Sequence, residues 1–217
     1  MTNQPAPTID LDSGLEIGYG SAIAKFAQPV TLTGGTHFLL ARNGRGKTTL
    51  LRTLARTLKP VSGGFRTEGF MQYLPEDLRF DPEITPAMVF RTLLPSSRLK
   101  DALDLAQHNE LDKKNPSARL PPGTRRKTNL ITAEFSVKQD RGNILLLDEP
   151  FSGLDAFARQ AFEEIWKASS ANVLRLVSCH PDYDSMEMPS ALMIEGHAVR
   201  HVGGAGQTWS ELKNLLN

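Results

Sequence analysis

The chain has 217 residues, of which 40% are hydrophobic and 23% are charged, and its formal net charge is +1. This composition is typical of one globular domain, and the near-neutral charge gives no reason to expect nucleic acid or an anionic membrane surface as a partner. No apolar run approaches the ~20 residues that a membrane-spanning helix needs, and residues 1–8 have no signal-peptide pattern. The single cysteine, Cys179, excludes an internal disulfide. We therefore expect a cytoplasmic protein that reaches a membrane only through a partner.

The N-terminal part of the chain predicts short strands separated by glycine and proline, at residues 15–19, 30–32 and 37–40. The third of these strands is apolar over residues 38–40, which suits a buried strand. It leads directly into the most informative segment of the chain, residues 41–50, which read ARNGRGKTTL.

Residues 41–50 have the pattern of a phosphate-binding loop. Gly44 and Gly46 let the backbone curl closely around an anion, and the residues from Lys47 onward predict a helix whose N-terminal amides face it. Lys47 would neutralise the terminal phosphates of a nucleotide, and Thr48 would bind Mg²⁺. The residues predicted to contact the nucleotide here are Asn43, Gly44, Arg45, Gly46, Lys47, Thr48 and Thr49.

One position departs from the usual pattern G-x-x-x-x-G-K-[ST], because Ala41 stands where the first glycine is expected. A negative φ at Ala41 would make the extra methyl group inexpensive, whereas a left-handed conformation would strain the loop. Taken alone, the segment is therefore also compatible with a plain Gly-rich turn between a strand and a helix.

Helices dominate the expected structure between residues 50 and 137. One helical face carries Leu50, Leu51, Leu54 and Leu58. Residues 59–64 contain proline and glycine and end this helix, and a strand follows at residues 70–74. Residues 85–107 are mainly helical, with Thr85 as the cap, and a further helix is expected within residues 123–137.

A second motif lies at residues 144–150, which read ILLLDEP. Its apolar run predicts a buried parallel strand that delivers Asp148 and Glu149 at its carboxyl end, where ligands bind in open α/β sheets. Asp148 would hold Mg²⁺ through water, and Glu149 would act as the base that polarises an attacking water. A core strand with a charged exit turn is the alternative, but the phosphate-binding loop makes it improbable.

The remaining elements follow from periodicity. Asp155 caps a helix, and strands are expected at residues 173–178 and 191–195. The expected core-facing residues of this helix are Phe157, Ala161, Phe162 and Ile165. Residues 208–211 have the spacing of a capping box, which predicts a short C-terminal helix.

Residues 146–155, LLDEPFSGLD, closely resemble the Walker B and D-loop segment of ATP-binding cassette (ABC) ATPases, which reads LLDEPxxxLD. The resemblance implies an α/β fold of the P-loop NTPase type, with a mostly parallel core sheet, a small antiparallel sheet and a helical subdomain. It implies one ABC ATPase domain over residues 1–217, with a core at 1–76 and 138–217 and a helical subdomain at about 77–137. ATP and Mg²⁺ would be its ligands.

Two further residues match the family by position. His180, 31 residues beyond Glu149, resembles the switch histidine that contacts the γ-phosphate, where a neutral imidazole could bridge this phosphate and Asp155 of the partner. Tyr19, 28 residues before Lys47, resembles the aromatic residue that stacks on adenine. A structural tyrosine is the alternative there, and Phe26 is the rival for stacking.

Two departures from the family concern the Q-loop and the signature. Glu76 stands where the family has the glutamine that ligates the metal and senses the transmembrane partner; a glutamate can still bind Mg²⁺, and Gln72 is wrongly placed to replace it. The signature, normally LSGGQ, corresponds here to Leu120 and the four residues that follow it. These four are Pro121, Pro122, Gly123 and Thr124.

The signature closes over the γ-phosphate of the opposite subunit in the family, and the prolines remove donors from it. Losing one or two charge-assisted donors could cost roughly 2–4 kcal/mol, or about 30- to 1,000-fold in rate. Arg125 or Arg126 could take over as a phosphate contact, or a partner ATPase with an intact signature could complete the site.

The resemblance implies an ATP-hydrolysing subunit that dimerises head-to-tail, as a homodimer or heterodimer, and powers a separate transmembrane transport subunit, in the manner of small exporters. Asp155 would lie at the dimer interface. Two alternatives remain: an ATP-gated dimerisation module with little hydrolysis, and a soluble ABC ATPase without a transport role. No nucleic-acid partner is expected.

Overall fold

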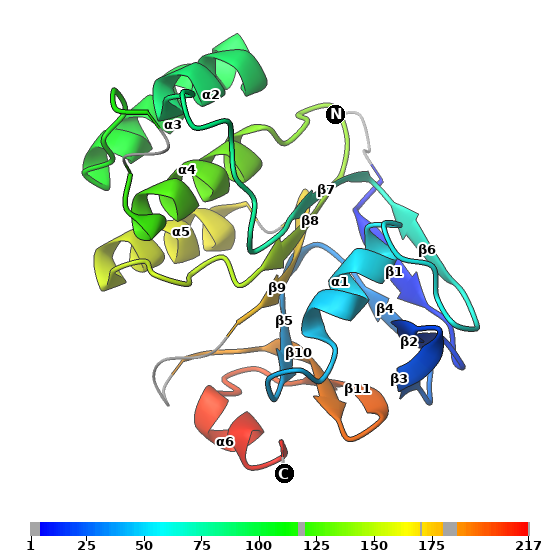
Figure 1. Ribbon diagram of the computed structural model, residues 1–217. Helices are drawn as coiled ribbons and strands as arrows, with labels where there is room; N and C mark the ends of the chain where they lie inside the picture. The colour runs from blue at the N-terminus through cyan, green and yellow to red at the C-terminus, as the bar shows by residue number, and fades with distance from the viewer. Residues whose placement is uncertain (1–4, 117–119, 170, 180–185, 217) are drawn as a thin grey trace.

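The computed structural model describes residues 5–116, 120–169, 171–179 and 186–216. The chain forms a large mixed sheet, a small antiparallel sheet and six helices among these residues (Figure 1). In the order of the large sheet, the strands are β2 (Glu16–Tyr19), β3 (Ser21–Phe26), β11 (Ala198–Gly203), β10 (Ser190–Glu195), β5 (Gly35–Ala41), β9 (Val173–Ser178), β8 (Asn143–Asp148) and β7 (Phe70–Leu74).

The centre of the large sheet is parallel. Strands β10, β5, β9, β8 and β7 all run in the same direction, whereas β11 is antiparallel to β10, and β2 is antiparallel to β3. Because β9 lies between β5 and β8, the phosphate-binding loop after β5 and the carboxylates after β8 emerge at the same edge. The expected α/β fold with a mostly parallel core sheet is thereby confirmed.

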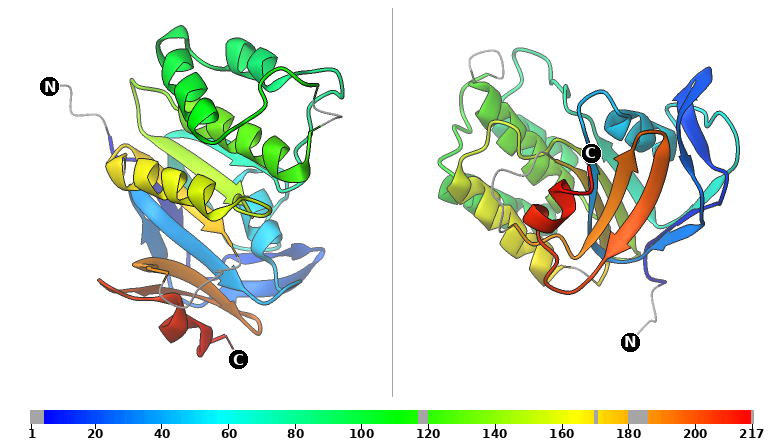
Figure 2. Two further views of the ribbon diagram at one scale, coloured as in Figure 1. Left: turned by 90° about the vertical axis from the view of Figure 1, so that its left-hand side faces the viewer. Right: turned by 90° about the horizontal axis from the view of Figure 1, so that it is seen from below.

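A second, smaller sheet lies beside the first, as Figure 2 shows. It consists of β4 (Val30–Leu32), β1 (Thr8–Leu11) and β6 (Phe65–Glu68), in this order. Both pairings are antiparallel, which confirms the small antiparallel sheet expected from the sequence.

The six helices cover both faces of the large sheet. They are α1 (Lys47–Leu54), α2 (Pro86–Leu93), α3 (Ser96–His108), α4 (Pro122–Phe135), α5 (Ala156–Ala168) and α6 (Trp209–Lys213). Helix α1 lies between the two sheets, whereas α4 and α5 lie against the opposite face of the large one (Figures 1 and 2). Helices α2 and α3 pack on α4 and on each other. The division into a core and a helical subdomain at about 77–137 stays a prediction.

Strand β8 is apolar throughout because both of its faces are covered. Ile144 and Leu146 pack with α1 in one core cluster, while Leu145 and Leu147 pack with α4 and α5 in the other. Successive strand side chains point to opposite faces, so a strand between two helical layers has no polar side. Its only polar residues are at its ends, and Asp148 is one of them.

A buried ion pair joins α4 to the sheet. Arg175 of β9 and Glu134 of α4 are each 1% exposed, and the Arg175 Nη2 lies 2.7 Å from Glu134 Oε2. Trp166 of α5 donates to Glu134 Oε1 at 2.7 Å, and Arg175 Nη2 also donates to Ser169 Oγ. A buried pair of this kind is tolerated because further hydrogen bonds support both side chains, although Arg175 Nη1 has no hydrogen-bond partner among the described residues.

Several local predictions are confirmed. The Thr85 side chain caps α2 by accepting from the Met88 amide, and the Asp155 side chain caps α5 by accepting from the Ala158 amide. The capping box at Thr208 and Glu211 is present at the start of α6.

No helix in the described part of the chain is long and apolar enough to cross a bilayer.

Two expectations are wrong. Helix α1 ends at Leu54, so Leu58 is not on its face; Arg56 adopts a left-handed φ of 60°, and the amides that follow fold back to the Arg52 carbonyl. Phe157 does not face the core but is 85% exposed. Of the other expected residues, Phe162 is fully buried and Ile165 packs against the core, and the remaining buried residues of α5 are Ala158 and Trp166.

Candidate nucleotide-binding site

A cavity of about 430 Å³ lies where the carboxyl ends of β5 and β8 meet the start of α1. It brings together segments that are far apart in the sequence: the phosphate-binding loop, the Q-loop position and the residues after β8. Its lining residues are Asn43, Gly44, Gly46, Lys47, Thr48, Thr49, Glu76, Glu149 and Ser152.

The start of α1 is suited to an anion. Gly46 is the N-cap residue and has a φ of 107°, which glycine adopts readily and other residues rarely do. No side chain caps this helix and no acidic residue lies in its first turn, so its N-terminal amides and the positive end of its dipole face the cavity. These groups fit the phosphates of a nucleotide.

Lys47 supplies the second cationic element of the cavity. Its side chain is 9% exposed, and Nζ donates to the Ala41 carbonyl at 3.3 Å. The same Nζ lies 3.4 Å from Glu149 Oε1. An incoming phosphate would therefore meet an ammonium group that is already oriented by the chain and partly neutralised by the candidate base.

Ala41 is accommodated without strain. It is the last residue of β5, and among non-glycine residues in the described ranges only Arg56, Glu110 and Glu149 have a positive φ. The first glycine of the usual motif is therefore dispensable here, since strand geometry suits alanine at least as well.

Asp148 is held by two hydroxyl groups that the sequence reading missed. The carboxylate is 1% exposed, Ser178 Oγ donates to Oδ1 at 2.7 Å, and the Tyr73 hydroxyl donates to Oδ2 at 3.4 Å. Burial, and then the nearby Asp148 charge, raise the pKa of Tyr73 to about 12, so Tyr73 stays a donor. The register of the parallel strands could have revealed the Ser178 contact, because Ser178 ends β9 directly beside Asp148.

Glu149 has an unusual backbone conformation, with a φ of 47°. Its amide donates to Ser178 Oγ at 2.9 Å, so Ser178 fixes both acidic residues at once. A left-handed glutamate costs conformational free energy and persists only where its surroundings determine it. The strained position turns the Glu149 side chain into the cavity, next to Lys47.

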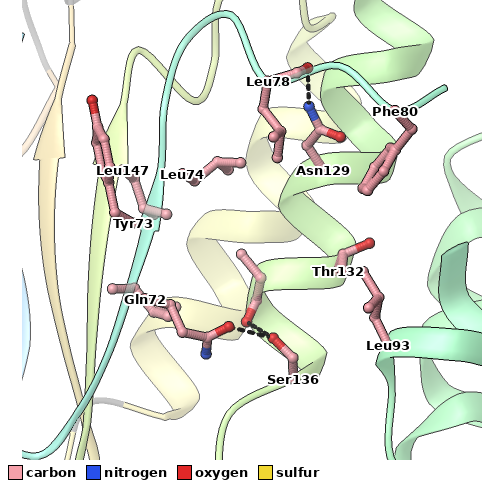
Figure 3. Close-up of a pocket in the computed structure, with 12 residues that line it drawn as sticks. Gln72, Tyr73, Leu74, Leu78, Phe80, Leu93, Asn129, Thr132, Ser136 and Leu147 are labelled. Carbon is pink, nitrogen blue, oxygen red and sulfur yellow. Dashed lines mark hydrogen bonds between the residues drawn. The ribbon is translucent and has the colours of Figure 1, made fainter. Parts of the chain in front are cut away.

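Glu76, but not Gln72, belongs to the cavity. Gln72 faces α4 instead, where its Oε1 accepts from Ser136 Oγ at 2.7 Å (Figure 3). Within the described ranges, no three His, Cys, Asp or Glu residues form a preassembled metal site. The predicted Mg²⁺ contacts are Thr48, Glu76 and Asp148, and such a small set suits a metal that keeps several waters and binds substrate phosphates.

The aromatic candidates for adenine stacking differ in exposure. Tyr19 is 60% exposed, and its hydroxyl accepts from Arg52 Nη1 at 3.4 Å. Phe26 is completely buried in the core and has no face to offer a ligand. Tyr19 therefore remains the candidate. His180 lies outside the described residues.

The signature segment forms the start of α4. Pro121 is the N-cap residue and Pro122 is the first residue of the helix, so neither offers an amide hydrogen there. Gly123 lies against the D-loop, because a Cβ at this position would be 2.4 Å from the Gly153 carbonyl oxygen. The arrangement leaves Gly123 and Thr124 as the donors predicted for a partner's phosphate.

The two arginines after the signature point in different directions. Arg125 is half-buried and donates to the Leu120 carbonyl at 2.8 Å. Arg126 is only 6% exposed and donates to the Pro75 carbonyl at 3.2 Å. The expectation that Arg126 could contact a partner's phosphate is therefore wrong, since its guanidinium is buried inside its own chain.

Asp155, the predicted D-loop contact, has two partners in its own chain. Besides capping α5, it pairs with Lys127 Nζ at 2.7 Å. The Lys127 contact and the Ala158 amide hold the pKa of Asp155 below its usual value. Its side chain is still 55% exposed.

Comparisons with known proteins agree with this geometry. A family model described as ABC transporter matches residues 31–152. The chain is 34% identical over 170 residues to the probable ATP-binding protein YheS of Escherichia coli K12, covering 74% of this chain but only 26% of YheS. It is 30% identical over 171 residues to the cytochrome c biogenesis ATP-binding export protein CcmA of Hyphomonas neptunium, covering 76% and 85%.

A solved structure of a putative ABC transporter ATP-binding protein from Pyrococcus furiosus shares the fold, with a TM-score of 0.67 at 20% identity. The alignment covers 86% of this chain and 97% of that structure. The family match spans more than half of the chain and includes the phosphate-binding loop, Asp148 and Glu149. The chain belongs to the ABC transporter family of ATP-binding domains, whose members bind and hydrolyse ATP.

Proposed function

We propose that this chain binds ATP and Mg²⁺ in the cavity at the start of α1, hydrolyses ATP between two head-to-tail subunits, and drives a separate transmembrane subunit. The observation that carries the proposal is the composition of the cavity wall, which combines the phosphate-binding loop with Glu76 and Glu149. Phosphate-binding groups and a candidate base share one space, as transfer of a phosphoryl group to water requires.

Each residue of the site has a distinct role in this proposal. Lys47 and the N-terminal amides of α1 hold the terminal phosphates, and Glu149 orients the attacking water and takes up its proton. Ser178 and Tyr73 keep the Asp148 carboxylate fixed. Mg²⁺, held by Thr48, Glu76 and Asp148, would neutralise charge on the phosphate oxygens. His180 would contact the γ-phosphate.

A second subunit would complete the site. The start of α4, residues 121–124, would close over the opposite subunit's γ-phosphate, and Asp155 would lie at the interface between the subunits. Because the two prolines offer no amide hydrogens, this chain would supply a good phosphate-binding face and a poor signature face. A homodimer would carry this defect twice, whereas a heterodimer with an intact partner signature would repair the site that contains Glu149.

Export from the cytoplasm is the proposed direction of transport. CcmA, which this chain covers over 85% of its length, is named an ATP-binding export protein. The proposed location is the cytoplasmic face of a membrane, where the chain is held by its transmembrane partner. Tyr19 would stack on adenine.

The signature favours one second candidate function. With Pro121 and Pro122 at the start of α4, the chain could act as an ATP-gated dimerisation module that scarcely hydrolyses. The cavity and the Glu149 geometry are common to both functions, so steady-state turnover separates them.

The test compares ATP hydrolysis by the purified chain with that of Glu149→Gln, while light scattering follows dimerisation. Turnover that falls by about 100-fold or more in Glu149→Gln is expected, since general-base catalysis contributes roughly this factor. Glu83→Gln, an exposed glutamate before α2, is the matched control and should keep the full rate.

Two outcomes contradict the proposal in different ways. ATP-dependent dimers without turnover in either protein would favour the dimerisation module or an obligate second ATPase. Failure of the chain to bind ATP at all would refute both functions.

A further inference from the structure

Helix α4 holds the segment that carries Glu76 through three side chains. Arg126 donates to the Pro75 carbonyl, and Asn129 donates to the Leu78 carbonyl at 3.0 Å. Two turns further along, at the C-cap of α4, Ser136 donates to Gln72 (Figure 3). Glu76 thus lies between two backbone carbonyls that are both fixed by α4, and its position depends on that helix.

Arg126 differs from the other two side chains because it brings a charge. Its guanidinium is buried, which lowers its pKa, but the nearby carboxylates of Glu76, Asp148 and Glu149 act in the opposite direction. An arginine keeps its proton even under such conditions. Residue 126 therefore places a permanent positive charge close to the acidic side of the site.

The other charges around the cavity give the positive charge of Arg126 a role in nucleotide binding. The site contains the three carboxylates of Glu76, Asp148 and Glu149. Lys47 pairs with Glu149, and Arg126 lies close enough to all three carboxylates to interact with their charges. A glutamate at the Q-loop position adds one negative charge to this group. A triphosphate entering such a site is repelled unless cations compensate the carboxylates.

We propose that Arg126 is a positioning residue of the nucleotide site, which fixes the loop carrying Glu76 and compensates the charge that Glu76 adds. This inference rests on the proposed function, because it concerns the same nucleotide and metal. It assigns to the signature helix a role in its own chain's site, separate from any contact with a partner's phosphate.

The experiment measures the affinity of a fluorescent ATP analogue in EDTA and in excess Mg²⁺. Arg126→Gln should weaken binding in EDTA about tenfold, which corresponds to ~1.4 kcal/mol, and should weaken binding in Mg²⁺ less. The ratio of the two affinities is the decisive readout, since a merely structural defect would lower both alike. Adding Glu76→Gln to Arg126→Gln should return the ratio to its original value.

Arg91→Gln is the matched control, because this arginine is exposed in the last turn of α2 and has no role in the proposed site. It should leave the ratio unchanged. An equal ratio for Arg91→Gln and Arg126→Gln would overturn the proposal, as would a double variant that fails to restore it.

Arg126→Lys covers the case in which Arg126→Gln does not fold. The lysine keeps the charge and should retain the original ratio; a shift as large as that expected for the neutral variant would refute charge compensation. Absence of ATP binding in the unmodified chain would refute the proposed function itself, whereas normal binding with an unaltered ratio in Arg126→Gln would refute only this inference.

Discussion

Two helix starts in this chain are proposed to bind phosphate, and their residues differ. Helix α1 begins after Gly46, whose left-handed conformation turns uncapped amides toward the cavity, and Lys47 adds a buried ammonium group. Helix α4 begins with Pro121 and Pro122, which offer no amide hydrogens, and Arg126 turns away into its own chain. Both helices retain a dipole, but α4 lacks amide donors at residues 121 and 122 and keeps only those of Gly123 and Thr124 in this segment.

The difference teaches that binding and catalysis can be separated in one chain. A complete phosphate-binding loop holds the ground-state nucleotide, whereas donors at a signature act where charge develops in the transition state. A chain with the first and without the second should bind ATP well and hydrolyse it slowly.

The largest expected effect is a loss of folding stability when the buried ion pair that joins α4 to the sheet is broken. Arg175→Met leaves the Glu134 carboxylate buried without its cation, and the free energy of unfolding should fall by ~3–5 kcal/mol. Urea titration measures the loss, and hydrogen exchange should accelerate in α4 more than in α1.

Replacing both members of this pair, by Glu134→Leu with Arg175→Met, should recover most of the lost stability, because no unpaired charge remains. A single variant that loses less than about 1 kcal/mol would show that the pair does not fix α4.

The next largest effect is expected from substitutions that make the start of α4 resemble the start of α1. Pro121→Ser combined with Pro122→Gly restores a hydroxyl group and two amide donors at the start of α4, and ATP turnover should rise by about 30-fold or more. Steady-state hydrolysis is the measurement. Pro95→Ser, which alters a proline at the same position of α3, is the control and should leave the rate unchanged. An unchanged rate in the signature variant would mean that its donors do not limit turnover.

A smaller effect is expected from a substitution in the phosphate-binding loop before α1. Ala41→Gly recreates the usual motif, but Ala41 has strand geometry, so the change should cost about 0.5–1 kcal/mol of stability without tightening ATP binding. Ala24→Gly in β3 should cost a similar amount. Tighter nucleotide binding by Ala41→Gly would show that the alanine impairs the loop.

The smallest effect concerns the pH dependence of folding stability and is expected from a substitution of His37. This residue lies on β5, before the phosphate-binding loop. Burial lowers the pKa of His37, and its ring bonds Ser190 and the Thr33 carbonyl. The folded state therefore favours the neutral ring: its contribution is complete above the unfolded pKa of ~6.5 and is lost as pH falls through the lower folded value.

Urea midpoints measured between pH 7 and 5 should accordingly fall less steeply in His37→Gln than in the unmodified chain. Gln107→Ala, an exposed change near the end of α3 that removes no titratable group, should leave the slope unchanged. Identical slopes for His37→Gln and the unmodified chain would exclude His37 as the group responsible.

The sequence predicted most of the fold and the composition of the cavity wall, for physical reasons that are local. Glycine spacing, apolar strand runs and capping residues act over a few positions, so residues 41–50 and 144–150 could be read directly. The shared edge of β5 and β8 followed from parallel pairing.

What the sequence could not predict depends on contacts between distant segments. Tyr73 and Ser178 support Asp148 through strand register, and the direction of Arg126 depends on how α4 packs against the segment after β7. The exposure of Phe157 shows a related limit, since the neighbouring Ala158 is buried in its place while the expected Phe162 is buried as well.

The contact between Gly123 and Gly153 has a consequence for how two sites would communicate. Gly123 belongs to the segment proposed to meet the opposite subunit's nucleotide, while Gly153 follows Ser152, which lines this chain's own cavity. The two backbones are so close that a methyl group on Gly123 would lie 2.4 Å from the Gly153 carbonyl oxygen. In a dimer, a displacement at one nucleotide would therefore push directly on the segment serving the other, and we expect hydrolysis at the two sites to be coupled rather than independent.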